Sequence, residues 1–168
     1  MNCHTQTVRP FRSETARYGE YSKAGEFVYD MPFLWGSKRT GPDLHRLGGK
    51  YPNKWHFDHL LDPTITSPGS IMPAYPWLHE QTIYNSLLDK KMNAMRVLGV
   101  PYSEDEIRNA FEDLQKQADE ITADLAANQV EVRSDSEIIA MIAYLQRLGR
   151  DIKAEAAETA SSVVISDN

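Results

Sequence analysis

The sequence lacks the features of a disulfide-bonded or membrane-spanning chain. Its 168 residues include one cysteine, Cys3, so no disulfide can form within the chain. No stretch approaches the roughly 20 consecutive apolar residues of a membrane helix, and the N-terminus lacks the basic and then apolar pattern of a signal peptide. With 41% hydrophobic residues, the polypeptide as written is expected to be soluble and to build one core in a single domain.

Positive charge is also scarce, and the net charge is −6. This argues against nucleic acid or an anionic membrane as a partner, because neither gains from an acidic surface. A basic protein partner would suit the chain better, with exposed charges steering encounter more than they set affinity.

Long regular elements are absent from the first half of the chain. Residues 1–79 are dense in glycine, proline and aromatic residues, which predicts loops with short helices. One helix is expected from Asn53 as N-cap to the break at Asp62-Pro63, since the residue before a proline is pushed out of the helical region. Such a loop-rich half, without a sheet or bundle pattern, commonly wraps a ligand or cofactor.

The second half has a helical pattern. From Glu80, apolar residues recur on one face up to a stop at Gly99, and another helix starts at Ser103, whose capping box closes with Glu106. The second helix carries a heptad-like seam, which predicts an antiparallel pair with the preceding helix; a partner-binding face is the alternative. The first helix presents Ile83, Leu87, Met95 and Leu98, and the seam contains Ile107, Phe111, Leu114, Ala118, Ile121 and Leu125.

A last helix is predicted from a second capping box, Ser134 to Glu137, to a stop at Gly149. No strand-like alternation is long enough to indicate a sheet, so the predicted class is all-α with long loops. Residues 154–168 lack helical period and aromatic anchors, which predicts a flexible tail. The last helix is expected to bury Ile138, Met141, Ile142, Leu145 and Leu148.

Cys3-His4 is the first candidate site. A c-type haem attaches to Cys-x-x-Cys-His, in which the histidine after the second cysteine is the proximal iron ligand. Here the first cysteine would fall one position before Met1, so only the second half of the motif is present. The alternative is a free thiol beside an exposed imidazole.

Met72 and a glycine-proline turn give this dipeptide a context. Met72 lies in an aperiodic, proline-bracketed loop that suits a soft iron ligand opposite a histidine, whereas the other five methionines fit ordinary core filling. Between the two candidates, Gly41-Pro42 could aim a backbone carbonyl at the ring N–H of His4. That bond would fix the tautomer of the histidine and raise its basicity.

In this order the chain resembles the class I cytochromes c, with a proximal histidine, a Gly-Pro-x-Leu turn, a methionine loop and a Tyr-Leu helix. More narrowly, over about residues 1–153, it resembles the mono-haem subunit, called CcoO or FixO, of cbb-type haem–copper cytochrome c oxidases. The segments that carry the resemblance include Arg9–Arg12 (RPFR), Trp35–Leu44 (WGSKRTGPDL), Met72–Leu78 (MPAYPWL) and Ala143–Gly149 (AYLQRLG).

The resemblance implies a fold and a site. The fold is an all-α, class I cytochrome c-like domain over residues 1–153, with a helical-hairpin insertion at about 90–133. One haem c would be held by Cys3 as the second thioether cysteine, His4 as proximal ligand and Met72 as distal ligand, with Pro42 and Arg39 completing the cofactor site. Candidates for charge-assisted bonds to the haem propionates are Arg9, Arg12, Lys38 and Arg39. Surface or intersubunit ion pairs are the alternative for these four residues.

The resemblance also implies a role and a location. Such subunits relay electrons from a dihaem subunit or a donor cytochrome to the catalytic haem–copper subunit, on the periplasmic face of the bacterial inner membrane, where an N-terminal transmembrane helix anchors them. The chain would then be a periplasmic fragment, an electron carrier without a catalytic site of its own. With one thioether cysteine it is expected to carry little or no covalent haem, and its loop-rich half to be disordered or held by self-association.

Other interpretations are open as well. In function, the alternatives are a free mono-haem shuttle cytochrome and a haem-free helical interaction module. His56 and His59 could share a metal, but no further ligand is nearby in the sequence. The three tryptophans are either walls of a haem pocket or structural anchors, namely Trp35, Trp55 and Trp77.

Overall fold

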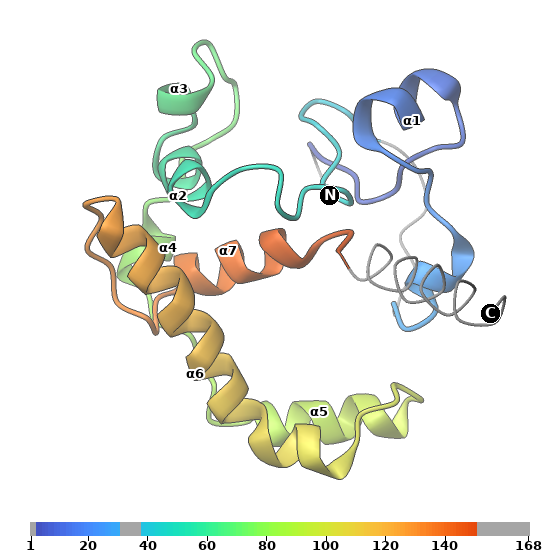
Figure 1. Ribbon diagram of the computed structural model, residues 1–168, viewed down its shortest axis with the longest axis vertical. Helices are drawn as coiled ribbons and strands as arrows, with labels where there is room; N and C mark the ends of the chain where they lie inside the picture. Colours follow the sequence, from blue (N-terminus) through green and yellow to red (C-terminus); the bar gives the residue numbers. More distant parts are fainter. Residues whose placement is uncertain (1–2, 31–37, 151–168) are drawn as a thin grey trace, which may run out of the picture. The chain divides into compact units, whose positions relative to one another are not determined.

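All regular structure in the described residues is helical. The computed structural model describes residues 3–30 and 38–150, and these ranges contain no strand, only an isolated antiparallel bridge between Thr82 and Ser136. The predicted all-α class, consistent with a cytochrome c-like fold, is confirmed, while the tail expected over 154–168 lies outside the described residues. In chain order the elements are α1 (Arg12–Tyr18), the 3₁₀-helix η1 (Ala24–Phe27), α2 (Asn53–Leu61), α3 (Pro63–Thr66), α4 (Trp77–Glu80), α5 (Leu88–Val97), α6 (Glu104–Ala127) and α7 (Glu137–Arg147) (Figure 1).

The chain divides into two compact units, and one boundary between them falls within α7. Unit 1 comprises the described residues up to Tyr51 and from Tyr144 onward, and unit 2 comprises Pro52–Ala143. Of the candidate iron ligands, His4 belongs to unit 1 and Met72 to unit 2.

Unit 2 has one apolar core, where side chains of α2, α6 and α7 meet. A fully buried Leu, Ile or Phe side chain contributes about 1.5–3 kcal/mol by leaving water, so this cluster fixes the places of three helices. Met72, Tyr75 and Leu78 pack against it. Its buried members are Phe57, Leu60, Ala118, Leu125, Ile138, Ile139 and Ile142.

The helix expected at Asn53 is present, with a different start. Pro52 occupies the N-cap position, and Asn53 is the first helical residue of α2. Its side chain donates instead to Asp124 Oδ2 of α6, at 2.9 Å. The helix ends before Asp62 as predicted, and the Asp62 carboxylate then caps α3 by accepting the Thr64 N–H at 3.0 Å.

The helix expected from Glu80 begins only at Leu88. The intervening segment pairs its backbone with the chain that precedes α7: the Ile83 N–H donates to the Asp135 carbonyl, and the Glu137 N–H donates to the Gln81 carbonyl, both at 2.9 Å. These bonds satisfy backbone groups that a helix would otherwise satisfy. The apolar period over 80–87 therefore did not indicate a helix.

The predicted start of the second helix of the pair, α6, is confirmed. Ser103 Oγ accepts the Glu106 N–H at 3.1 Å, and Glu106 Oε2 accepts the Ser103 N–H at 2.7 Å, as the capping box predicted. α5 packs against α6, and the two run as a hairpin (Figure 1).

The seam of α6 is covered in two parts. Ile107 and Ala110 are buried in its first turns, and Ala118 and Leu125 are buried in the unit 2 core. Phe111, expected in the seam, is 58% exposed. α5 has 10 residues and α6 has 24, so helices of about 15 and 36 Å cannot cover each other along their full length.

The capping box predicted at Ser134 is wrong. α7 begins at Glu137, which leaves Ser136 as the residue before the helix. The Ser136 carbonyl accepts the Ile139 N–H at 3.2 Å, whereas Ser134 accepts a hydrogen bond from Gln115. The bridge at Ser136 places the start of the helix two positions after the one that the sequence pattern indicated.

Most of the apolar face expected for α7 is buried. Ile138, Ile142 and Leu145 are buried as predicted, and Leu148 is half-buried. Met141, however, is 36% exposed, because Ile139 is the residue that enters the core.

The end of α7 is held within unit 1 by a close backbone approach. The Gly48 N–H donates to the Leu148 carbonyl at 2.8 Å, and a Cβ built on Gly48 would lie 2.5 Å from the Gln146 carbonyl oxygen. Only glycine fits there. The Gln146 side chain completes the junction by accepting from the Gly49 N–H and donating to the Tyr51 carbonyl, both at 2.9 Å.

Candidate functional site

The ring of His4 is held by the Gly41-Pro42 turn. His4 Nδ1 lies 2.6 Å from the carbonyl oxygen of Pro42. A carbonyl oxygen can only accept, so Nδ1 is the protonated nitrogen and Nε2 keeps its lone pair for a metal. The hydrogen bond predicted from this turn is thereby confirmed, and it orients the imidazole as well as fixing its tautomer.

Backbone hydrogen bonds on both sides of His4 join the same two segments. The Gly41 N–H donates to the Cys3 carbonyl and the Leu44 N–H to the Thr5 carbonyl, each at 2.9 Å. A Cβ built on Gly41 would lie 2.7 Å from Nδ1 and 2.6 Å from Nε2 of His4. The ring can lie against the turn only because residue 41 has no side chain.

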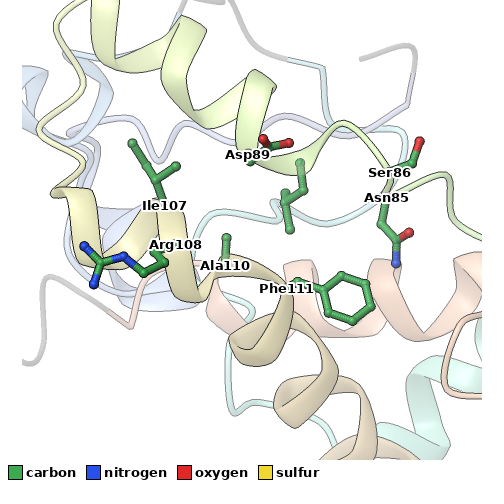
Figure 2. A pocket seen from close by; sticks show the side chains of 8 residues that line it. Asn85, Ser86, Asp89, Ile107, Arg108, Ala110 and Phe111 are labelled. Carbon is green, nitrogen blue, oxygen red and sulfur yellow. The ribbon is translucent and has the colours of Figure 1, made fainter.

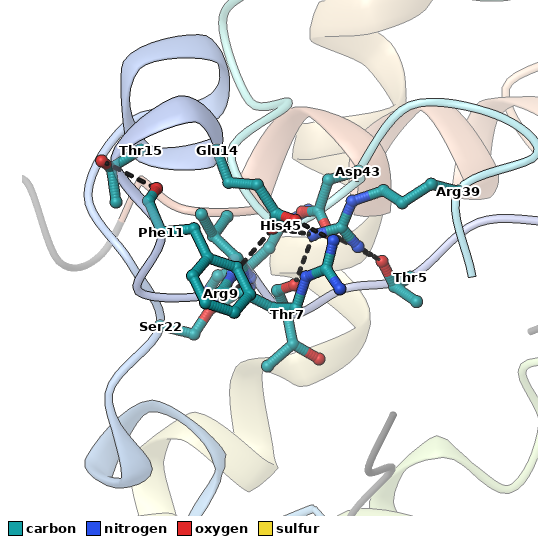
Figure 3. A network of polar contacts seen from close by, with 11 residues as sticks. Thr5, Thr7, Arg9, Phe11, Glu14, Thr15, Ser22, Arg39, Asp43 and His45 are labelled. Atoms are coloured by element: carbon teal, nitrogen blue, oxygen red, sulfur yellow. Dashed lines mark hydrogen bonds and ion pairs between the residues drawn. The ribbon is translucent and has the colours of Figure 1, made fainter. Parts of the chain in front are cut away.

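Arg39 joins three parts of unit 1 beside this turn (Figure 3). Its guanidinium donates to Thr5 Oγ1, to the Thr7 carbonyl at 3.1 Å and to Glu14 Oε2 of α1 at 2.6 Å. It also forms an ion pair with Asp43 Oδ2, at 3.2 Å. The network links the segment that carries His4, the helix α1 and the turn.

Asp43 has a fully buried side chain within this network, at 0% exposed. Its Oδ2 accepts from Thr5 Oγ1 at 2.9 Å, and its Oδ1 accepts the His45 N–H at 2.8 Å. Burying a carboxylate is costly unless it is paired and hydrogen-bonded, and Arg39, Thr5 and His45 together meet that requirement.

Glu14 has a strongly lowered pKa, about 2. The main cause is the side-chain hydrogen bond with Arg9; burial acts in the opposite direction, and the Arg9 N–H and Arg39 lower the pKa further. Arg9 and Arg39 are thus ion-paired within the chain. Arg12 and Lys38 are exposed.

One donor of Arg39 is left over. Its Nε is buried and has no hydrogen-bond partner among the residues that the structure describes. Leaving a buried N–H unsatisfied costs about 1–3 kcal/mol. The position therefore suits an acceptor from outside the described chain, such as a cofactor carboxylate.

A second ion-paired cluster, which no sequence motif indicated, lies around Glu26. Glu26 accepts from both terminal nitrogens of Arg46, at 2.8 and 2.9 Å, and lies 2.6 Å from His45 Nε2. Burial raises the pKa of Glu26, but bonds from Arg46, the Lys23 N–H and His45 outweigh it and lower the pKa to about 2. His45, which had no assigned role, therefore ties η1 to the chain that follows the turn.

Met72 lies in a loop anchored to the core of unit 2. The Tyr75 N–H donates to the Leu60 carbonyl of α2 at 2.8 Å, and the Met72 N–H donates to Ser70 Oγ at 3.2 Å. The Met72 side chain is half-buried and packs against the core cluster. The loop has a defined place within its unit, as a ligand-bearing loop requires.

The tryptophans and the histidine pair that the sequence suggested as site residues mainly contact other side chains of the chain. Trp55 stacks on His59, with ring centroids 4.5 Å apart, and Trp77 meets Tyr75 edge to face. His56 is buried, and burial, followed by the charge of His59, lowers its pKa to about 4. No group of three or more potential metal ligands occurs in the described part of the chain, and Trp35 lies outside it.

A shallow pocket of about 220 Å³ lies between α5 and α6 (Figure 2). Leu88, Ile107, Ala110 and Phe111 give it an apolar floor, with polar groups at its rim. None of the predicted ligands lines it, so it is separate from the candidate site.

The residues of unit 1 fit the attachment end of a haem c site. Cys3 is an exposed free thiol, His4 is oriented with Nε2 available, and Arg39 has an unused buried donor. Within the described ranges, no helix is long and apolar enough to cross a membrane.

The comparison with known families gives one match. The family model described as cytochrome c oxidase, mono-heme subunit/FixO, matches residues 1–152. No curated protein matches the chain. The family match covers both the His4 segment and the Met72 loop.

Proposed function

The chain belongs to the mono-haem subunit (FixO) family of cytochrome c oxidase, and on this premise we propose that it relays electrons through one haem c to the catalytic subunit of a cbb-type oxidase. The observation that carries the proposal is the 2.6 Å contact between His4 Nδ1 and the Pro42 carbonyl. A histidine whose other nitrogen is fixed in this way is the usual form of a metal-ligating imidazole.

Three residues would hold the cofactor. Cys3 would supply a thioether bond, His4 the proximal ligand and Met72 the distal ligand, while Pro42 would orient His4. When bound, haem c would supply a one-electron iron couple for electron transfer. The chain would hold the ligand side chains and the haem in fixed positions.

The proposed partners are the catalytic haem–copper subunit and, as donor, the dihaem subunit or a donor cytochrome, at the periplasmic face of the inner membrane. The charge of α6 supports a partner protein with a basic surface. The helix carries eight acidic and two basic residues, so its own net charge equals the net charge of −6 of the whole sequence. Such a helix steers a basic protein toward it. We further propose that the α5–α6 hairpin is the insertion, at about 90–133, in a cytochrome c-like domain over 1–153.

The ligand assignment can be tested on a chain with a cysteine placed directly before Met1, which completes Cys-x-x-Cys-His, exported to a periplasm that attaches c-type haem. We expect covalent haem with a methionine-to-iron charge-transfer band. Met72→Ala should keep the covalent haem and lose the band. Met95→Ala, which changes a half-buried methionine of α5, should keep both.

Two results would contradict the proposal. The first is a completed motif that acquires no haem under conditions in which a control cytochrome c does. The second is a charge-transfer band that survives Met72→Ala, which would assign the distal position to another residue.

A further inference from the structure

The segment that carries His4 is fixed at its next residue by side chains as well as by backbone. Thr5 is 2% exposed, and its hydroxyl accepts from Arg39 and donates to Asp43 Oδ2 at 2.9 Å. The Thr5 carbonyl accepts the Leu44 N–H. Thr5 is therefore attached to the turn at both its backbone and its hydroxyl, one residue away from the imidazole that bonds Pro42.

Arg39 holds this attachment in place through bonds that occupy its terminal nitrogens. Nη1 donates to the Thr5 hydroxyl and forms the ion pair with Asp43, and Nη2 donates to the Thr7 carbonyl and to Glu14. Only Nε lacks a partner among the described residues. The guanidinium is committed to joining the His4 segment with α1 and the turn, as Figure 3 shows for Thr5, Glu14 and Asp43.

We propose that Arg39, acting through Thr5 and Asp43, is a positioning residue that keeps the His4 ring aligned with the Pro42 carbonyl. This inference rests on the proposed function of His4 as an iron ligand. It differs from the role that the sequence suggested for Arg39, direct contact with a haem propionate.

The two roles predict opposite changes in reduction potential. A positioned His4 bonds the Pro42 carbonyl well, which makes the imidazole a stronger donor and favours the oxidised iron. Loosening the ring therefore raises the potential. If Arg39 acted mainly as a positive charge at a propionate, its removal would favour the oxidised iron by Coulomb's law and lower the potential.

Thr5→Val is the decisive variant, because it keeps the shape and charge of the site and removes only the hydroxyl. Thr5→Ser is the matched control that keeps the hydroxyl. In the haem-loaded, motif-completed protein we expect Thr5→Val to raise the reduction potential and to speed exchange of the His4 ring N–H, followed by NMR in the reduced state, about tenfold, as loss of one net hydrogen bond implies. Thr5→Ser should match the parent in both measurements.

The arginine variants separate position from charge. Arg39→Lys keeps the charge without the forked geometry, so it should raise the potential as Thr5→Val does. Lys50→Gln removes an exposed positive charge of unit 1 and should not change ring N–H exchange. Since Arg39→Gln leaves the buried Asp43 without its ion pair and can fail to fold, the test depends on Thr5→Val.

The outcomes are distinct. A raised potential with faster ring exchange in Thr5→Val, and neither in Thr5→Ser, supports the inference. An unchanged or lowered reduction potential in Thr5→Val, together with an Arg39→Lys variant whose potential matches the parent, overturns it in favour of a charge effect. A parent protein without haem refutes the proposed function, and the inference with it; a loaded parent that does not respond to Thr5→Val refutes the inference alone.

Discussion

Gly41 is the residue on which the position of the His4 ring depends. Its N–H bonds the Cys3 carbonyl, and its missing side chain leaves the space that the imidazole fills. The requirement is steric, since it comes from the close approach of a ring to backbone and not from an unusual φ angle.

Gly41→Ala should therefore displace the ring. The added methyl group would lie within 3 Å of both ring nitrogens, and we expect a loss of about 1–3 kcal/mol in the free energy of unfolding, as for overpacked sites. Urea denaturation of the haem-loaded protein measures it. Gly25→Ala is the control, because nothing lies within 4 Å of its Cβ position; equal losses in both variants would show that the space beside His4 is not the cause.

At this scale the sequence predicted what short motifs encode. His4, the Gly41-Pro42 turn and the bond between them follow from residue types with defined chemistry. Thr5, Glu14 and Asp43 were not predicted, because their contacts with Arg39 join positions that no period or motif relates. The nearest signal was Arg9 five positions before the acidic Glu14, a spacing that does not match the i,i+3 or i,i+4 pairs of a helix surface.

The start of α6 shows how a local motif sets an element. Ser103 and Glu106 satisfy each other's backbone N–H groups. The hydrogen bond that the Ser103 N–H donates to the Glu106 carboxylate is the main cause of the lowered pKa of Glu106. Three acidic residues in the first turn also suit the positive end of the helix dipole.

Ser103→Ala should cost about 1 kcal/mol of stability, the usual cost of losing an N-cap. It should raise the pKa of Glu106 only part of the way to its ordinary value, because the N–H of residue 103 still donates to the carboxylate. Ser134→Ala, at the position where the sequence pattern placed a second cap, should have little effect because α7 starts at Glu137. Denaturation curves and an NMR titration of Glu106 measure both. A larger loss in Ser134→Ala than in Ser103→Ala would contradict this assignment of the caps.

The elements that the sequence misplaced are those decided by distant partners. The segment 81–87 has a helical period but bonds the chain before α7. The same contact moves the start of α7 from the position of the Ser134 motif. Phe111 has seam spacing but is exposed, and it lines the open pocket between α5 and α6.

In the molecule as a whole, three groups with strongly lowered pKa values divide between the two units. Glu14 and Glu26 belong to unit 1, each with a pKa of about 2 against an ordinary value of 4.5. His56 belongs to unit 2, with a pKa of about 4 against 6.5. No sequence pattern indicated this division, because burial and partners rather than residue type set the pKa values.

The sign of the pH effect is the same for all three groups, but the pH range differs. Between pH 6.5 and about 4, unfolded chains bind a proton at His56 that the folded chain does not, so acidification lowers the stability of unit 2 in this range. The lowered pKa values of Glu14 and Glu26 stabilise unit 1 above 4.5, and this stability is lost as the pH falls toward 2.

Lowering the pH from 7 to 5 should therefore destabilise unit 2 before unit 1. From the His56 shift we expect a loss on the order of 2 kcal/mol at pH 5. Residue-resolved urea unfolding by NMR at the two pH values distinguishes the units. His56→Leu should abolish most of the loss in unit 2, whereas His79→Gln, which changes an exposed histidine of the same unit, should leave it unchanged. An equal loss in both units, or one that persists in His56→Leu, would mean that burial of His56 does not govern the acid response.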